Sequence, residues 1–281
     1  MAQRNFQFIG IDLDGTLLTR NKKIHKAAYA ALDAFYDLNP NCIGAIITGR
    51  FYNSAKRHCD SINENTKKFK INYLGCGNGS LFYKINNHDD YQLIKKTLIK
   101  SADAKKIYDL CQKHKILFWG CSDHLFKGAP VILSHHFIGY CIRLFRYKDV
   151  NISKIYVDEN YSKINVIASP KKLNAFFTEL NELYPDTFQV IRTATLMFEI
   201  TAKNTHKGEI VNAVCERHQI PFNKRVAIGD SNNDLKMFEN VNIKVALANA
   251  SPELKRAATY VSKKRGLKRF SSVFEDYLLK L

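Results

Sequence analysis

The fold is decided near the N-terminus, where residues 6–16 read FQFIGIDLDGT. The segment Phe6–Ile11 is apolar without helical spacing, and it ends abruptly in the polar stretch 12–16. This pattern predicts a buried strand that leads into a loop. Two carboxylates one residue apart at a strand end are not explained by core packing, because each needs an opposite charge or a metal to offset its burial. A simple turn at Asp14-Gly15 is the alternative.

The residues that follow this strand predict a helix and then a second strand. Apolar residues recur every three or four positions from His25 to Leu38, which predicts an amphipathic helix. Ile43–Ile47 predicts a second buried strand, and this strand ends in Thr48-Gly49-Arg50. A strand, a helix and a strand, with polar residues at the carboxyl end of each strand, are typical of a parallel α/β sheet.

The same order returns near the C-terminus. We expect a helix over Lys207–His218, a strand over Val226–Ile228 that enters the polar loop Gly229–Asp234, and another strand over Val245–Ala248. Ser251-Pro252 predicts the N-cap and the first position of a further helix. Two ends with matching patterns imply one discontinuous domain.

The middle of the chain has a different pattern, because its strand-like segments are less uniformly apolar. Such strands are expected where one face of a sheet is solvated or lines a cleft. We therefore predict a parallel α/β core from residues 1–84 and 198–281, with an inserted α+β module over residues 85–197. The expected helices of the module are Ala102–His114 and Pro170–Leu183, and its expected strands are Ile116–Gly120, Tyr140–Tyr147, Ile164–Ala168 and Phe188–Ile191.

Composition limits the class of protein. The chain has 281 residues, of which 46% are apolar and 25% charged, which excludes disordered and collagen-like classes. Its net charge of +17 would attract nucleic acid, acidic membranes or phosphorylated small molecules, but an AT-rich genome also produces lysine-rich proteins, so both origins stay open. Seven scattered cysteines favour a reducing compartment. With no secretion signal and no apolar stretch of membrane-spanning length, we expect a cytoplasmic protein without a membrane partner.

A second acidic cluster follows the predicted strand Val226–Ile228. Asp230 and Asp234 lie there at the start of a helix. Hard oxygen ligands of this kind suit Mg²⁺, which takes one or two protein carboxylates and keeps water and substrate phosphate as its other ligands. Helix capping by Ser231 or Asn232 is the alternative.

Two further segments carry groups that suit a phosphate. Thr48-Gly49-Arg50 supplies a hydroxyl, a loop in which backbone N–H groups can be exposed, and a cation. Lys207, at the start of a predicted helix, supplies a compact positive charge. A single lysine is most often a surface residue, so Lys207 by itself carries little weight.

In order along the chain, these clusters resemble the four motifs of the haloacid dehalogenase-like hydrolase superfamily. The insertion after Asn78-Gly79, together with Asn249-Ala250, resembles the Cof-type subfamily with a large α/β cap. The resemblance implies a Rossmann-like catalytic core, residues 1–84 and 198–281, and a cap, residues 85–197, that determines substrate specificity. The motif residues are Asp12-Leu13-Asp14-Gly15-Thr16, Thr48-Gly49-Arg50, Lys207-Gly208, and Gly229-Asp230 with Asn233-Asp234.

The resemblance also implies a mechanism. Asp12 would be the nucleophile that forms an aspartyl-phosphate, and Asp14 would be the general acid and then the general base. Mg²⁺ would be held by the carboxylates of Asp12 and Asp230 and the backbone carbonyl of Asp14, with Asp234 orienting the site. Arg50 would contact the substrate or pair with a nearby carboxylate. The implied phosphate-binding residues are Thr48, Gly49, Lys207 and Asn233.

We therefore expect a Mg²⁺-dependent phosphatase whose partner is a small phosphorylated metabolite, such as a sugar phosphate or a phosphorylated cofactor. A nucleic-acid-binding protein is one alternative, which the net charge favours, but the sequence has no helix-turn-helix or zinc-finger signature, so we do not expect nucleic acid as the partner. A phosphomutase that uses the same aspartyl-phosphate is the other. The sequence predicts no oligomeric state.

Overall fold

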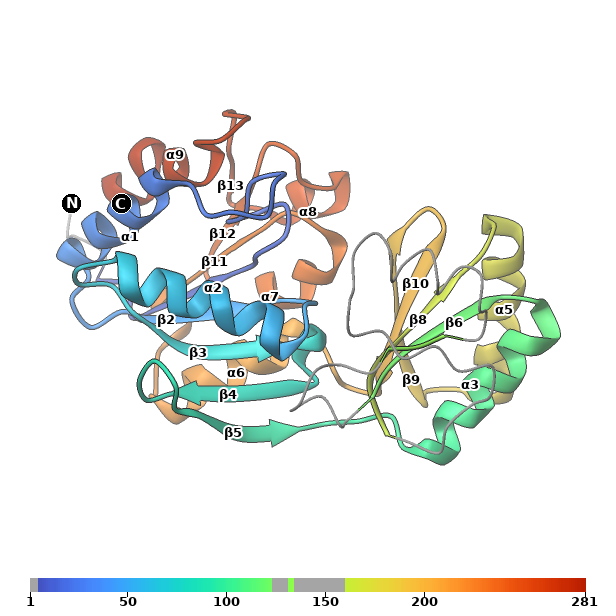
Figure 1. Cartoon of the computed structure of the whole chain (residues 1–281). Helices are drawn as coiled ribbons and strands as arrows, with labels where there is room; N and C mark the ends of the chain where they lie inside the picture. The colour runs from blue at the N-terminus through green and yellow to red at the C-terminus, as the bar shows by residue number, and fades with distance from the viewer. Residues whose placement is uncertain (1–4, 123–130, 134–159) are drawn as a thin grey trace. The chain divides into compact units, whose positions relative to one another are not determined.

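The computed structural model describes residues 5–122, 131–133 and 160–281 (Figure 1). The chain divides into two compact units, a core unit of Met1–Lys95 and His206–Leu281 and a cap unit of Lys96–Thr205. The predicted junctions at 84/85 and 197/198 differ from these by about ten residues. Strand β5 (Tyr91–Lys96) belongs to the core sheet, and strand β10 (Met197–Ala202) belongs to the cap sheet.

The core unit contains an eight-stranded sheet in the order β13-β12-β11-β1-β2-β3-β4-β5. The strands from β13 to β3 are parallel, and β4 is antiparallel to β3. This sheet confirms the predicted α/β fold with a parallel core. The bounds are β1 Phe8–Ile11, β2 Ile43–Ile47, β3 Ile71–Cys76, β4 Leu81–Ile85, β11 Arg225–Gly229, β12 Ile243–Ala246 and β13 Tyr260–Val261.

Strand β1 is central in this sheet and is buried along its whole length. It pairs in parallel with β2 on one side and with β11 on the other, so that Ile9 lies opposite both Gly44 and Val226. A strand buried on both faces needs the continuous apolar sequence that residues 8–11 have. Because parallel strands end at the same edge of a sheet, the loops after β1, β2 and β11 come together. They do so although more than 200 residues separate β1 from β11 in sequence.

Helices cover both faces of the core sheet (Figure 1). Helices α6 (Lys207–Arg217), α7 (Leu235–Phe238) and α8 (Pro252–Ala257) bury apolar side chains against one face. Helices α1 (Lys26–Leu38), α2 (Tyr52–Asn65) and α9 (Arg269–Asp276) lie on the other. The predicted N-cap of α8 is confirmed, since the Ser251 side chain accepts a hydrogen bond from the Leu254 backbone N–H.

The cap unit is a five-stranded antiparallel sheet in the order β7-β6-β8-β10-β9. Alternate residues of β8, such as Ile164 and Val166, join the buried cluster that also includes side chains of helices α3 and α5. The predicted strand Tyr140–Tyr147 lies outside the described residues. The bounds are α3 Ser101–His114, β6 Leu117–Ser122, β7 Val131–Leu133, β8 Tyr161–Ile167, α5 Pro170–Leu183 and β9 Phe188–Ala194.

Candidate active site

Three carboxylates meet at the carboxyl edge of the core sheet. Asp12 follows β1, and Asp230 and Asp234 follow β11. One oxygen of each lies within 4.8 Å of an oxygen of the other two. The parallel pairing of β1 with β11 is what brings these residues together, and it places the predicted metal-ligating carboxylates in one cluster.

A buried lysine balances part of this negative charge. The Lys207 ammonium donates to Asp12 Oδ1 and to Asp234 Oδ1, each at 2.6 Å, and its side chain is only 1% exposed. Lys207 is the first residue of α6, so the turn into that helix directs its side chain into the cluster. The structure thus places Lys207 beside the predicted nucleophile. From the sequence alone, a single lysine is most often expected at the surface.

Asp234 holds the loop after β11 in place. Its Oδ2 accepts hydrogen bonds from the backbone N–H groups of Asp230 and Ser231, at 2.9 and 3.0 Å, while its Oδ1 accepts from Lys207. Ser231 also caps the short 3₁₀ helix Asn232–Asp234, so the capping alternative for this cluster is present together with the acidic cluster. Both oxygens of Asp234 are therefore engaged in hydrogen bonds, which fix the loop beside Asp12 and Asp230.

Asp230 is oriented by two uncharged side chains. Its Oδ1 accepts from Thr16 Oγ1 at 3.1 Å, and its Oδ2 accepts from Asn249 Nδ2 at 2.8 Å. Gly15 lies directly against it, with φ of +79°, and a Cβ there would be 1.9 Å from Asp230 Oδ2. Only glycine allows both this backbone conformation and this close approach.

The electrostatics of the cluster suit a divalent cation. Burial raises the pKa of the Asp12 carboxyl to about 8, although the Lys207 ammonium opposes the rise, and Asp234 and Asp230 add to it. Burial and the Asp234 charge raise the pKa of Asp230 to about 6. Lys207 donates to two of the three carboxylates, whereas Asp230 accepts from the uncharged side chains of Thr16 and Asn249, so the ionised cluster carries more negative than positive charge. A divalent cation with hard oxygen ligands would balance that excess and favour the ionised carboxylates.

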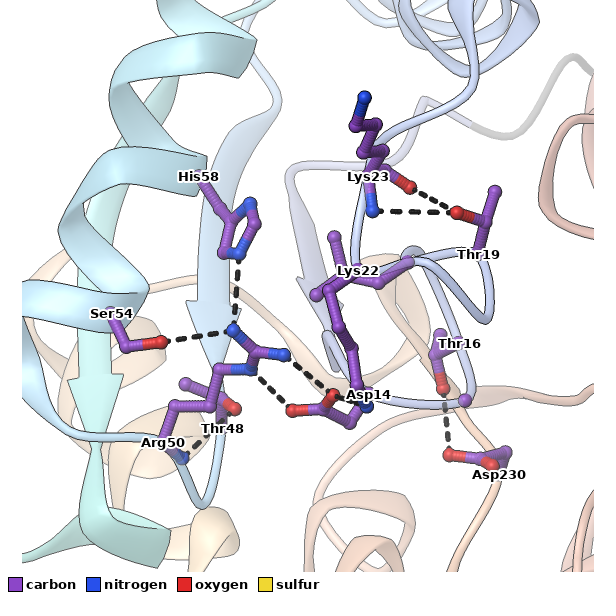
Figure 2. A network of polar contacts seen from close by, with 12 residues as sticks. Asp14, Thr16, Thr19, Lys22, Lys23, Thr48, Arg50, Ser54, His58 and Asp230 are labelled. Carbon is purple, nitrogen blue, oxygen red and sulfur yellow. Dashed lines mark hydrogen bonds and ion pairs between the residues drawn. The ribbon is translucent and has the colours of Figure 1, made fainter. Parts of the chain in front are cut away.

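Asp14 lies outside this cluster and is held by two cations (Figure 2). Arg50 Nη2 donates to its Oδ1 at 2.8 Å, Arg50 Nε donates to its Oδ2, and Lys22 Nζ donates to its Oδ1. Partial burial raises the pKa of the Asp14 carboxyl, but the hydrogen bonds from Arg50 and Lys22 outweigh it and hold that pKa well below its usual range. Of the two predictions for Arg50, the ion pair with a nearby carboxylate is formed. Its contact with a substrate stays a prediction.

Two of the four predicted phosphate-binding residues, Thr48 and Gly49, directly follow β2. Thr48 is 1% exposed, and its Oγ1 accepts from the Arg50 backbone N–H at 3.2 Å. A Cβ at Gly49 would lie 3.0 Å from Asn78 Oδ1, and the same oxygen accepts from Asn233 Nδ2 at 3.1 Å. Asn233 is therefore joined to the loop after β3 through Asn78.

Four residues of this region were not assigned roles from the sequence: Thr16, Lys22, Asn78 and Asn249. Asn249 follows β12, so the rule that polar residues at parallel strand ends meet could have found it. Asn78 is 1% exposed with φ of +59°. No local pattern distinguishes Lys22 among the many lysines of the chain.

Comparison with known proteins identifies the family. A family model described as haloacid dehalogenase-like hydrolase matches residues 9–266. This chain belongs to the haloacid dehalogenase-like hydrolases. The match covers all four motifs, and the resemblance to Cof-type members is confirmed.

Related proteins agree with this assignment. A Mycoplasma pneumoniae protein named "Putative phosphatase" is 31% identical to this hydrolase over 95% of the chain and 96% of its own length. TM0651 from Thermotoga maritima has a TM-score of 0.74 at 22% identity and covers 96% of this chain and 97% of its own. The subclass IIB sugar phosphatase BT4131 has a TM-score of 0.76 at 17% identity and covers 96% and 98%. This haloacid dehalogenase-like hydrolase is a phosphatase, and the nucleic-acid-binding and phosphomutase alternatives are not favoured.

In the part of the chain that the structure describes, none of the helices combines the length and the apolar character of a membrane span.

Proposed function

We propose that this hydrolase is a Mg²⁺-dependent phosphatase that hydrolyses small phosphorylated metabolites through an aspartyl-phosphate on Asp12. The observation that carries the proposal is the convergence of Asp12, Asp230 and Lys207 at one sheet edge. Asp12 and Asp230 would hold the cation together with the backbone carbonyl of Asp14. The bound cation would neutralise charge on the phosphate, which otherwise repels an attacking carboxylate.

The surroundings of Asp12 support a nucleophilic role. In the described part of the chain, Lys207 contacts Oδ1 of Asp12, so the carboxylate is fixed through one oxygen while the other can point to a phosphate. The new bond joins an Asp12 oxygen to phosphorus as the bond from phosphorus to the ester oxygen breaks. Splitting one difficult displacement into two steps in this way lowers each barrier.

Asp14 would complete both steps by moving protons after it parts from Arg50 and Lys22, which in this structure hold it ionised through both of its oxygens. It would donate a proton to the departing ester oxygen, and then accept one from the water that attacks the aspartyl-phosphate, which yields inorganic phosphate and restores Asp12. Thr48, Gly49 and Asn233 would donate hydrogen bonds to phosphate oxygens at the end of β2, and Lys207 would stabilise the charge that develops there.

The test is release of inorganic phosphate from a panel of sugar phosphates, phosphorylated cofactors and simple phosphomonoesters. We expect release with Mg²⁺, none after EDTA treatment, and recovery when Mg²⁺ is restored. Asp12→Asn should lower release by at least about a thousand-fold, because it removes the nucleophile. Asp37→Asn is the matched control, since Asp37 is an exposed carboxylate on α1 that pairs with Lys68.

Full activity of Asp12→Asn, or equal activity with and without a divalent cation, would overturn the proposal. Transfer of phosphate to an acceptor without net release would instead identify a phosphomutase.

A further inference from the structure

A run of basic residues lies between strand β13 and helix α9 of the core unit. Residues 263–269 read KKRGLKR, so five of the seven positions carry a positive charge. Residues 263–268 form the basic loop, and all six are exposed at the margin of the core unit (Figure 1). Six residues span at most about 20 Å, so the four cations of the basic loop lie close together.

Most of the charge of the basic loop is not neutralised by the protein. Lys264 Nζ lies 3.5 Å from Asp276 Oδ1. In the part of the chain that the structure describes, the other three cations, Lys263, Arg265 and Lys268, pair with no carboxylate. Like charges so close together repel one another, and an anionic partner would remove that repulsion.

A second basic segment lies beside the basic loop. Arg269 Nη2 donates to the backbone oxygen of Leu18, which joins the start of α9 to the segment after β1. Arg20 and Lys23 follow in that segment, and both are exposed. The positive patch therefore extends from the basic loop onto residues 20–23.

An apolar side chain stands among these cations. Leu267 is 63% exposed, which is the largest exposed fraction of any large apolar side chain among the described residues. It follows Gly266, which has φ of +85° and no atom within 4 Å of an added Cβ, so this turn of the loop stands clear of other residues. An apolar side chain at such a position can enter the interface of a bilayer while the surrounding cations contact anionic headgroups.

A nucleic acid fits the same features less well. Proteins that bind single strands combine cations for the phosphates with aromatic side chains on which the bases stack. The basic loop has no aromatic residue. On either side of it, Phe270 is buried, and Tyr260 stacks on Tyr277 with the ring centroids 4.3 Å apart. The exposed Leu267 therefore favours a lipid surface as the partner.

We propose that the basic loop docks this hydrolase on a bilayer surface that contains anionic lipids. Lys263, Arg265 and Lys268 would contact the headgroups, and Leu267 would enter the interface. Docking on the surface needs no membrane-spanning segment, whereas the sequence-based prediction of no membrane partner rested on the lack of one.

The experiment measures co-sedimentation of the purified protein with vesicles of phosphatidylglycerol and phosphatidylcholine. We expect binding that is absent with phosphatidylcholine alone and that falls steeply as the salt concentration rises from about 0.1 to 0.5 M. Replacing Lys263, Arg265 and Lys268 together by glutamine should weaken binding about a hundred-fold, because each cation near an anionic surface contributes about five-fold.

The matched control replaces three exposed cations elsewhere in the core unit by glutamine, namely Lys26, Lys67 and Arg217. It removes the same total charge, so vesicle binding should fall by less than about three-fold. Equal losses in the two triple variants would mean that only the net charge of +17 attracts the vesicles, which would overturn the proposal. All six side chains are exposed, and thermal unfolding checks that both variants fold.

Leu267 distinguishes a lipid surface from a nucleic acid. Leu267→Ala should weaken vesicle binding about five-fold. Leu183→Ala, at a leucine of α5 that is 54% exposed, should leave it unchanged. With anionic vesicles, the tryptophan emission of Leu267→Trp should shift to shorter wavelength, and that of Leu183→Trp should not.

Three results would overturn the proposal: no binding of the wild-type protein to anionic vesicles, an unchanged affinity in Leu267→Ala, or no emission shift in Leu267→Trp. Binding to oligouridylate without binding to vesicles would identify a nucleic acid as the partner instead. Vesicle binding is measured without a substrate, so it stands or falls independently of the proposed phosphatase activity.

Discussion

Replacing Lys207 by methionine tests whether a buried ammonium holds the acidic cluster together. Lys207 is 1% exposed and donates to Asp12 and Asp234 at 2.6 Å each. Methionine has a similar length and no charge, so Lys207→Met leaves the packing largely filled and removes the countercharge of two buried carboxylates.

The expected cost is large because the remaining carboxylates are shielded from water. Removing one partner of a buried ion pair typically costs about 3 to 5 kcal/mol. For a unit of this size that corresponds to a decrease in Tm of roughly 6 to 20 °C. Lys236→Met is the matched control, since Lys236 is half exposed and pairs with Glu239 at 2.9 Å. Loss of such an exposed pair should cost less than about 1 kcal/mol.

Calorimetry of the metal-free protein measures the effect on the core transition. Mg²⁺ should shift this transition upward, because a cation that binds the folded cluster and not the unfolded chain stabilises the folded core. Mg²⁺ should stabilise Lys207→Met more than the wild-type protein, because it supplies the missing positive charge. Lys207→Met should also cost less in an Asp12→Asn background, where one of the two charges is gone. Additive effects of the two substitutions within about 0.5 kcal/mol would refute the reasoning.

Two further predictions concern the surroundings of this cluster. Gly15→Ala should weaken the apparent affinity for Mg²⁺ at least about ten-fold, measured by titration of activity, because its Cβ would displace the Asp230 carboxylate. Gly266→Ala, which has a similar φ of +85° but no atom within 4 Å of the new Cβ, should leave that affinity unchanged. The contribution of His58 to the free energy of unfolding should fall as the pH decreases from 7 to 5, since unfolded His58 binds a proton near pH 6.5 and folded His58 only near pH 4. We expect about 1 to 2 kcal/mol of this loss at pH 5 to be absent in His58→Gln, and an identical pH dependence of the two proteins in urea titrations would contradict it.

The local elements could be predicted because their signals are local. The apolar run that ends at Ile11 gave β1, the three-and-four spacing before Leu38 gave α1, and Ser251-Pro252 gave the start of α8. The carboxyl-end rule for parallel strands then predicted that Asp12 and Asp230 meet, because it needs only the order of the elements and not their coordinates. The polar residues at strand ends were thus enough to predict where the acidic cluster of the candidate site forms.

Only the tertiary structure decided which charge each of these groups faces. Asp12 and Asp14 are two residues apart, yet one faces Lys207 in the buried cluster and the other faces Arg50 and Lys22. Sequence spacing cannot separate these environments, because Lys207 comes from a helix nearly 200 residues away. The same holds for His58, whose Nε2 lies 3.2 Å from Arg50 Nη1 although eight residues separate the two in sequence. Ion pairs depend on distances of a few ångströms, and those distances are set by packing and not by the pattern along the chain.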